Sequence, residues 1–251
     1  RAPEDAKYIR VFRSIRPTTF TLTTSGVIIR AISSNYTPNS ITFGKVYVEG
    51  ETDEPRTLSL MEVYSAKLDG LSTFYAMFRR CKNLRKVSIN FGQAKNIVAA
   101  NSMFEVCHNL QSVDLSNMDT HSLTNTMYMF SVCYKLTDMG DLSKWDVSNV
   151  TSMTNMFANC ESITSFDFVK NWDVSNVTSM INMFVNCFSI TSLDLSNWNP
   201  KSVTQLNGMF NNAKNLITLD VSGWNTYKVT VLEQTFANLV SLTDLNIDGW
   251  N

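Results

Sequence analysis

The sequence predicts an α/β solenoid, a right-handed stack of repeated units with a parallel β-sheet on one face and short helices on the other. A phenylalanine recurs seven times from Phe78 to Phe236, every 26 or 27 positions. Within a unit the apolar period changes from two, as in a strand, to three, three and one, as on a helical face. The 251 residues are 44% hydrophobic and 17% charged, which is typical of a folded protein and excludes disorder.

Two repeat positions are apolar or small in every unit. Methionine precedes six of the seven phenylalanines, and the residue three positions later is small or apolar. One unit cannot bury its apolar face alone, so the units must stack with their strands side by side. The two positions hold Phe78, Phe104, Phe130, Phe157, Phe184, Phe210 and Phe236, and then Cys81, Cys107, Cys133, Cys160, Cys187, Ala213 and Leu239.

The repeat is predicted to cover residues 58–251 in about eight rungs, a rung being one repeat of the chain. The first two strands are assigned the apolar residues Leu58, Met61 and Val63, then Leu84, Val87 and Ile89. Two units are one residue longer than the others, because Gly140 is an extra residue in one and the stretch 169–171 is longer in the other. We expect both extra residues to form single-residue bulges.

Residues 1–57 do not fit the repeat. They hold alternating runs at 8–12, 20–22, 27–29 and 41–48, separated by Pro17, Gly26, Pro38 and Gly50. This pattern predicts a small β-rich N-terminal module or a cap of the solenoid. The sequence opens at Arg1 and stops at Asn251 in mid-unit, so we expect it to be a piece of a longer protein.

Threonine and asparagine recur on either side of each predicted helix. The threonines are expected to be helix N-caps, because a hydroxyl can accept a bond from a free N–H group. The asparagines are expected to end the helices in the left-handed conformation. The two sets are Thr151, Thr178, Thr204 and Thr230, and Asn159, Asn186, Asn212 and Asn238.

The cysteines and tryptophans are expected to be core residues. All five cysteines share one repeat position that Ala213 and Leu239 also fill, so they form a line and do not converge on a metal. We predict free thiols. The recurring tryptophans could stack on sugar rings, but their position after the strand favours the core. They are Trp145, Trp172, Trp198, Trp224 and Trp250.

Carboxylates and hydroxyls recur between the inward-facing strand positions, so a period of two directs them to the open face. We predict that this strip is a concave, polar ligand-binding surface, although structural hydrogen bonding is an alternative. A calcium ion needs six to eight oxygens around one point, so only weak cation binding is expected. The strip consists of Asp114, Asp141, Asp167, Asp194 and Asp220, with Ser112, Ser165, Ser192 and Thr218.

Charge and motifs exclude several classes of function. Residues 1–86 carry 14 Lys and Arg against 8 Asp and Glu, whereas residues 87–251 carry 7 against 14. The larger part therefore has no basic stripe for nucleic acid. No apolar run approaches the ~18 residues of a membrane span. The two histidines fit no catalytic or metal-binding spacing, and the chain has no phosphate-binding loop, so neither an enzyme nor a cofactor is predicted.

The segment W-D-V-S-N-V-T-S-M-T-N-M-F-A-N-C at 145–160, and its near copy at 172–187, resemble the BspA-like leucine-rich repeat. This is the 26-residue variety of mycoplasmal lipoproteins and other bacterial surface proteins. The resemblance implies a leucine-rich-repeat solenoid that is exposed on a cell surface and binds host or neighbouring-cell components. Ala66 and Gly92 stand in place of the tryptophan and Val98 in place of the threonine, so the first units are expected to be adapted as a cap.

The expected function is therefore non-enzymatic recognition or adhesion at a cell surface or outside the cell, with a protein or glycan as the partner. The alternative is a structural spacer, such as a virion-fibre or surface-assembly component. The opening A-P-E-D-A-K-Y-I-R-V is weakly similar to the final strand of carbohydrate-binding domains in phage fibres. Neighbouring domains of a larger surface or fibre protein are further possible partners.

Overall fold

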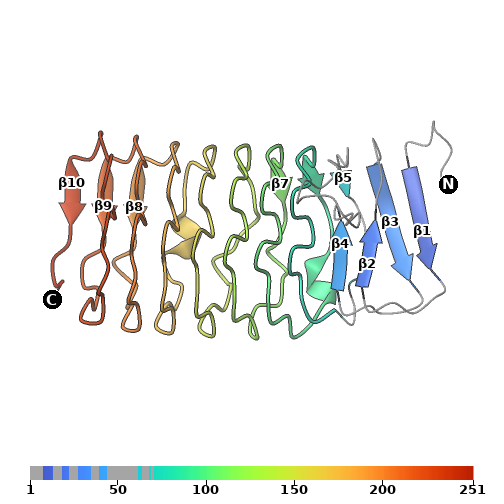
Figure 1. The fold of residues 1–251 in the computed structure, drawn as a ribbon, viewed down its shortest axis with the longest axis horizontal. Coiled ribbons are helices and arrows are strands. Elements are labelled where there is room, and N and C mark those ends of the chain that lie inside the picture. Colours follow the sequence, from blue (N-terminus) through green and yellow to red (C-terminus); the bar gives the residue numbers. More distant parts are fainter. Residues whose placement is uncertain are drawn as a thin grey trace, which may run out of the picture.

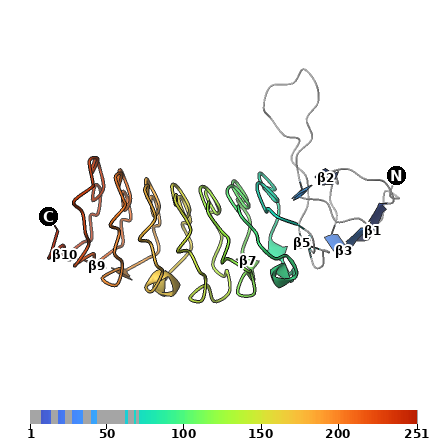
Figure 2. The same ribbon diagram turned by 90° about the horizontal axis from the view of Figure 1, so that it is seen from below.

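The computed structural model describes strand segments within residues 8–63, residue 68 and residues 71–250. The chain forms a single row of rungs, with consecutive rungs side by side (Figure 1). Turned by 90°, the row bends gently (Figure 2). The elements are β1 (Tyr8–Arg13), β2 (Thr19–Leu22), β3 (Ile28–Ser34), β4 (Ser40–Phe43), β5 (Glu62–Val63), β6 (Lys86–Val87), η1 (Phe91–Gln93), β7 (Ser112–Val113), η2 (Asp167–Val169), β8 (Ser192–Asp194), β9 (Thr218–Asp220) and β10 (Asp244–Asn246).

Every pair of described strands is parallel, which confirms the parallel pairing predicted for the repeat. One sheet has the order β1-β3-β5-β6-β7, a second has β10-β9-β8, and β2 pairs with β4. Lys86 pairs with Ser112, and Ser192 with Thr218, so the strand register equals the repeat length. A second ladder of single bridges joins Ala99, Asn125, Ser152, Ser179, Gln205 and Val231 in succession. Neighbouring rungs are thus joined at the strands and again at this second ladder, which continues without the strand pairing between Asp138 and Ser192.

The predicted short helices are wrong. Each rung has instead an irregular stretch around its phenylalanine, which we call a turn segment. In one of them, the N–H groups of Asn155, Phe157 and Asn159 donate to carbonyls of the next rung at 2.8–3.0 Å. The N–H groups of the residues between them, Met156 and Ala158, donate to carbonyls three residues earlier in the same segment. Because alternate N–H groups point along the row, a helical ladder cannot form. The turn segments are residues 74–81, 100–107, 126–133, 153–160, 180–187, 206–213 and 232–239.

Left-handed residues give the turn segments this alternation. Two residues in each segment, four positions apart, have positive φ; Asn155 has φ 55° and Asn159 has φ 60°. The left-handed conformation predicted for Asn159, Asn186, Asn212 and Asn238 is therefore confirmed, although no helix ends there. The predicted threonine N-caps are wrong, because each hydroxyl donates to the preceding rung, as from Thr178 to the carbonyl of Thr151 at 2.9 Å.

The core runs along the whole row. Phenylalanine rings of successive rungs stack with centroids 5.2–6.0 Å apart, from Phe78 to Phe236. The indole N–H groups donate to carbonyls of the preceding rung, as from Trp224 to Leu195 at 2.9 Å. Since Trp145 to Trp224 are at most 5% exposed, these rings are core residues and form no platform for sugars.

The five cysteines form no disulfide in the described part of the chain and are buried, as predicted. Four of them donate to the carbonyl of a phenylalanine in the preceding rung, as from Cys160 to Phe130 at 3.3 Å. Burial raises the pKa of the Cys81 thiol to about 12, so it stays protonated and unreactive at neutral pH.

Four strands lie near the predicted alternating runs of the N-terminal region, and β1 and β3 join the same sheet as β5. The boundary at residue 57 stays a prediction. The predicted frame of the next strand is wrong by two residues, because Val63 pairs with Val87 and not with Ile89. A slip of two leaves the same alternate residues on each face, so the apolar pattern alone cannot distinguish the registers.

The two long rungs interrupt the sheet between β7 and β8. The N–H of Val113 donates to the carbonyl of Asp138, and the N–H of Leu115 donates to the carbonyl of Met139. The donors are two residues apart, whereas the acceptors are adjacent in the chain. The pairing is thus irregular beside Gly140, where the sequence predicts a bulge. In the next rung the extra residue forms η2 rather than the predicted bulge. The inward position predicted for Phe168 belongs to Val169, which is fully buried.

Candidate functional site

The open face of β8, β9 and β10 holds the densest group of predicted site residues. Leu193 and Leu219, at the centres of β8 and β9, are 3% and 1% exposed, so the residues on either side of them face outward. The in-register pairing aligns these outward residues in two columns. One column is Ser192, Thr218 and Asp244, and the other is Asp194, Asp220 and Asn246.

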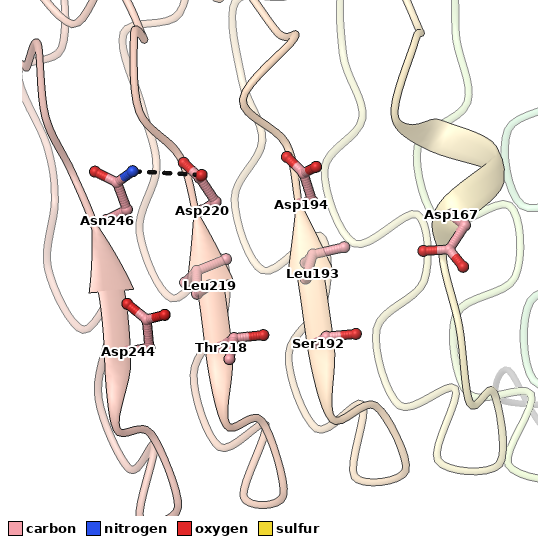
Figure 3. A pocket seen from close by; sticks show the side chains of 9 residues that line it. All are labelled: Asp167, Ser192, Leu193, Asp194, Thr218, Leu219, Asp220, Asp244 and Asn246. Atoms are coloured by element: carbon pink, nitrogen blue, oxygen red, sulfur yellow. Dashed lines mark hydrogen bonds between the residues drawn. The ribbon is translucent and has the colours of Figure 1, made fainter.

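The two columns border a shallow hollow of about 180 Å³ (Figure 3). Asp167 from η2 closes one end of it, and Asp244 and Asn246 of β10 line the other. The lining therefore combines four carboxylates, two hydroxyls and one amide around the edges of Leu193 and Leu219. Such a surface can accept hydrogen bonds from hydroxyl, ammonium or guanidinium groups.

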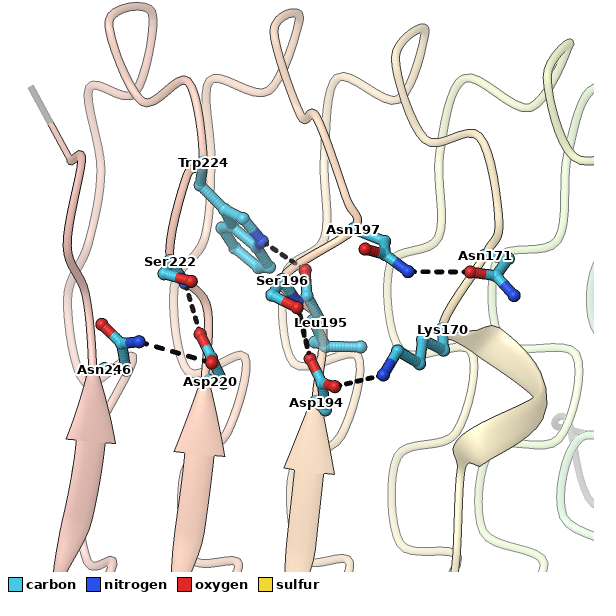
Figure 4. A network of polar contacts seen from close by, with 10 residues as sticks. All are labelled: Lys170, Asn171, Asp194, Leu195, Ser196, Asn197, Asp220, Ser222, Trp224 and Asn246. Carbon is cyan, nitrogen blue, oxygen red and sulfur yellow. Dashed lines mark hydrogen bonds and ion pairs between the residues drawn. The ribbon is translucent and has the colours of Figure 1, made fainter.

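Asp194 is the most strongly held carboxylate of the hollow. One oxygen accepts from the N–H and the hydroxyl of Ser196 at 3.0 and 2.6 Å, and the other accepts from the Lys170 ammonium at 2.5 Å (Figure 4). The Lys170 contact and then the Ser196 contacts lower the pKa of Asp194 to about 2. Asp194 is consequently ionised at any physiological pH.

Asp220 has a weaker set of partners. It accepts from the N–H of Ser222 at 2.9 Å and from the side-chain amide of Asn246 at 3.3 Å (Figure 4). Hydrogen bonding within the protein, the structural alternative for the strip, thus engages both oxygens of each of these carboxylates, although an ionised carboxylate has further acceptor sites. The same turn, from an aspartate to the residue two positions on, occurs at Asp146 and Asp173 outside the hollow. The carboxylates can therefore shape the backbone and still present oxygen to a ligand.

The structure brings together only part of the predicted strip. Five of its residues line the hollow: Asp167, Asp194, Asp220, Ser192 and Thr218. Ser112 and Asp114 lie at and beside β7, on the other side of the two long rungs. Ser165 is exposed and accepts from the N–H of Asp167 at 3.0 Å.

Asp141 does not belong in the strip. The extra residue shifts it by one position, and Gly140 takes the place opposite Asp114. A Cβ at Gly140 would lie 2.4 Å from an Asp114 oxygen, which shows how closely the two positions approach. Asp141 instead accepts from the N–H of Ser143 at 2.9 Å, and its contacts with Ser143 lower its pKa.

Sequence reasoning missed five residues of the site. Asp244 could have been found by continuing the column of Ser192 and Thr218 by one more repeat. Asn246 continues the column of Asp194 and Asp220 in the same way. The longer unit indicated an insertion near Lys170, but nothing in the pattern showed that its ammonium would reach the next rung. Leu193 and Leu219 were recognised only as core.

Neither a metal centre nor a membrane span is evident in the part of the chain that the structure describes. No group of three His, Cys, Asp or Glu is arranged there to hold a metal ion. None of the helices described is long and apolar enough to cross a bilayer. His121 contacts Asp119 at 2.5 Å and lowers its pKa, but this pair is exposed and lies far from the hollow in sequence. The expected weak calcium affinity stays a prediction.

The family model of a mycoplasma protein of unknown function, DUF285, matches residues 72–168 and 162–251. The chain belongs to this family. A solved leucine-rich cell surface protein from Faecalibacterium prausnitzii A2-165 is similar over 94% of this chain and 89% of that chain, with 14% identity and a TM-score of 0.28. No curated protein matches the sequence.

Membership in DUF285 agrees with the predicted relation to a repeat family of mycoplasmal proteins. The two matched segments overlap and together span the rungs from residue 72 onward, including the whole hollow. The BspA-like variety of the repeat stays a prediction.

Proposed function

We propose that this chain is a non-enzymatic recognition module of the BspA-like leucine-rich-repeat solenoid type, displayed at a cell surface or outside the cell. Its partner is a protein or a glycan, bound at the open face of β8, β9 and β10. The hollow between the two in-register columns is the observation that supports this function. Its carboxylates and hydroxyls recur at the spacing of neighbouring strands, about 4.8 Å, which suits a ligand with repeated donor groups.

The chemistry of the hollow supports binding more than catalysis. Asp194 is held ionised by Lys170, so it is a poor proton donor at neutral pH. Ser192 and Thr218 stand on the same strands as the carboxylates, and no histidine lines the hollow to activate either hydroxyl. Fixed acceptors beside a small apolar floor are typical of sites that select a ligand by its donor pattern.

A structural spacer is the alternative function. A spacer needs only a rigid row, and its outer face could be the same in every rung. The strand face is instead uneven, since Lys86 stands in the column where later rungs carry Ser192, Thr218 and Asp244. This unevenness favours recognition at one part of the row.

An array of glycans and extracellular-matrix proteins tests the proposal. The variant D194N/D220N/D244N keeps the side-chain shapes but removes three charges of the hollow. The control D146N/D173N alters the same kind of aspartate turn outside it. We expect ligands of the wild type to be lost by the first variant and retained by the second. Binding that survives the triple substitution, or an array without any ligand, would refute recognition at this face and favour the spacer.

A further inference from the structure

The turn segments suggest a second surface, distinct from the strand face. Each segment has a left-handed residue directly before the position of the recurring cysteine. From Asn159 onward this residue is always asparagine, which tolerates the left-handed conformation. In the three preceding segments it is Arg80, Val106 and Val132, with φ between 62° and 64°. A β-branched residue at such a φ is strained.

Asparagine fits the same backbone four times in this chain, so the fold does not require valine at this position. Val106 and Val132 are adjacent in the row, since the N–H of Val106 donates to the carbonyl of Ser131 at 2.8 Å. Both side chains are partly exposed. Strained residues that the backbone does not require occur preferentially where the side chain has another role.

Two tyrosines lie close to these valines in the sequence. Tyr128 precedes Val132 by four residues, is itself left-handed with φ 57°, and is 37% exposed. Tyr134 is equally exposed, and its ring lies 5.0 Å from that of His108. We call Val106, Tyr128, Val132 and Tyr134 the valine–tyrosine patch. Exposed tyrosine with aliphatic neighbours is enriched in the centres of protein interfaces.

The charge beside the patch is positive. Arg79 and Arg80 belong to the preceding turn segment and Lys82 directly follows it, whereas Lys86 stands on the strand face and Lys95 pairs with Asp119. Arg79 and Glu105 form a two-pronged ion pair at 2.8 and 3.1 Å, so the acidic residue is already compensated. Lys82 lies close enough to contribute to the lowered pKa of His108. A partner with acidic groups would therefore be attracted to this side of the patch.

We propose that the valine–tyrosine patch is a docking surface for an acidic protein segment that carries an apolar or aromatic anchor. The anchor contacts Val106, Val132 and the two tyrosines, and the acidic groups face the basic residues of the preceding rung. This surface lies at the turn segments 100–107 and 126–133 and the residue that follows the second of them, Tyr134, whereas the proposed recognition face belongs to residues 167–246. The two sites can be tested independently.

Selection from a display library of short random peptides tests the proposal, with the whole chain immobilised. We expect enriched peptides to combine Asp or Glu with an apolar or aromatic residue. A synthetic peptide of the enriched sequence should bind V106N/V132N at least about tenfold more weakly than the wild type, while the melting temperature of this variant rises. Loss of binding together with gained stability is a result that a purely structural role of the valines would not give.

Three controls complete the experiment. Asn186→Gly changes the same position outside the patch and should leave peptide binding unchanged. D194N/D220N/D244N should also leave it unchanged, which separates this proposal from the strand-face function. Replacing the acids of the peptide by amides should weaken binding. An unenriched library, equal binding by V106N/V132N, or equal capture of a sulfated polysaccharide at the patch would each refute the proposal.

Discussion

The turn segments of residues 74–133 and those of residues 153–239 have the same backbone but different surfaces. In the first group the left-handed positions before the cysteine hold arginine and valine, and in the second they hold asparagine. The second group is closed by a ladder of side-chain amides, from Asn212 to Asn186 at 2.6 Å and from Asn186 to Asn159 at 2.7 Å. Bonds between rungs therefore set the backbone in both groups, and the residue at the left-handed position is free to serve stability or binding.

The core should be the same in both groups. Substitutions in the core should lower the free energy of unfolding more than any other change. Phe157 stacks on Phe130 and Phe184 and is fully buried, so Phe157→Ala should cost about 3–5 kcal/mol. Phe104→Ala in the first group should cost a similar amount, because Phe104 is equally buried between two rings. Phe236 is only partly buried, and its loss should cost less. Denaturant melts measure all three, and equal losses at Phe157 and Phe236 would contradict the stacking.

Asn186→Val should reproduce in the second group the strain of the first. It removes two amide hydrogen bonds and forces a β-branched residue into the left-handed conformation. The expected loss of stability is about 2–3 kcal/mol, measured by denaturant unfolding. Asn186→Gly, which avoids the strain, should lose distinctly less. If both variants were equally stable, the left-handed position would not be under conformational strain.

Val132→Asn is the reverse exchange and should stabilise the chain. The strain at φ 64° is relieved, and an amide is placed one rung from Asn159, where it can extend the ladder. We expect a gain of about 1 kcal/mol and a higher melting temperature. A destabilised variant would show that valine contributes more through packing than it costs in backbone strain.

The smallest effect concerns the charge that the second long rung adds to the strand face. Lys170→Gln should raise the pKa of Asp194 from about 2 towards its ordinary value of 3.8. Because the folded pKa is lowered, this carboxylate stabilises the fold above about pH 4, and the stabilisation is lost as the pH falls towards 2. Both side chains are over 40% exposed, so the variant should lose less than about 1 kcal/mol. A carboxyl titration by NMR measures the pKa, with Asp173 as an unaffected control.

The sequence by itself determined the parallel stack, its register from Lys86 onward outside the two long rungs, and the columns of the core. These features follow from apolar residues that recur every 26 or 27 positions, because each rung must bury them against its neighbours. The outward direction of Ser192, Asp194, Thr218 and Asp220 followed from the period of two. The burial of the cysteines in one column followed from the repeat, because Ala213 and Leu239 occupy the same position in later units.

Tertiary structure alone decided the conformation of the turn segments and the extent of the site. The spacing of Val150, Met153 and Met156 fits a helix equally well, but the neighbouring rung offers carbonyls to alternate N–H groups and stabilises left-handed residues between them. The extra residue at Gly140 displaced Asp141, and η2 placed Lys170 beside Asp194. A one-residue insertion changes which side chains meet across rungs, and a repeat pattern records the insertion without its direction.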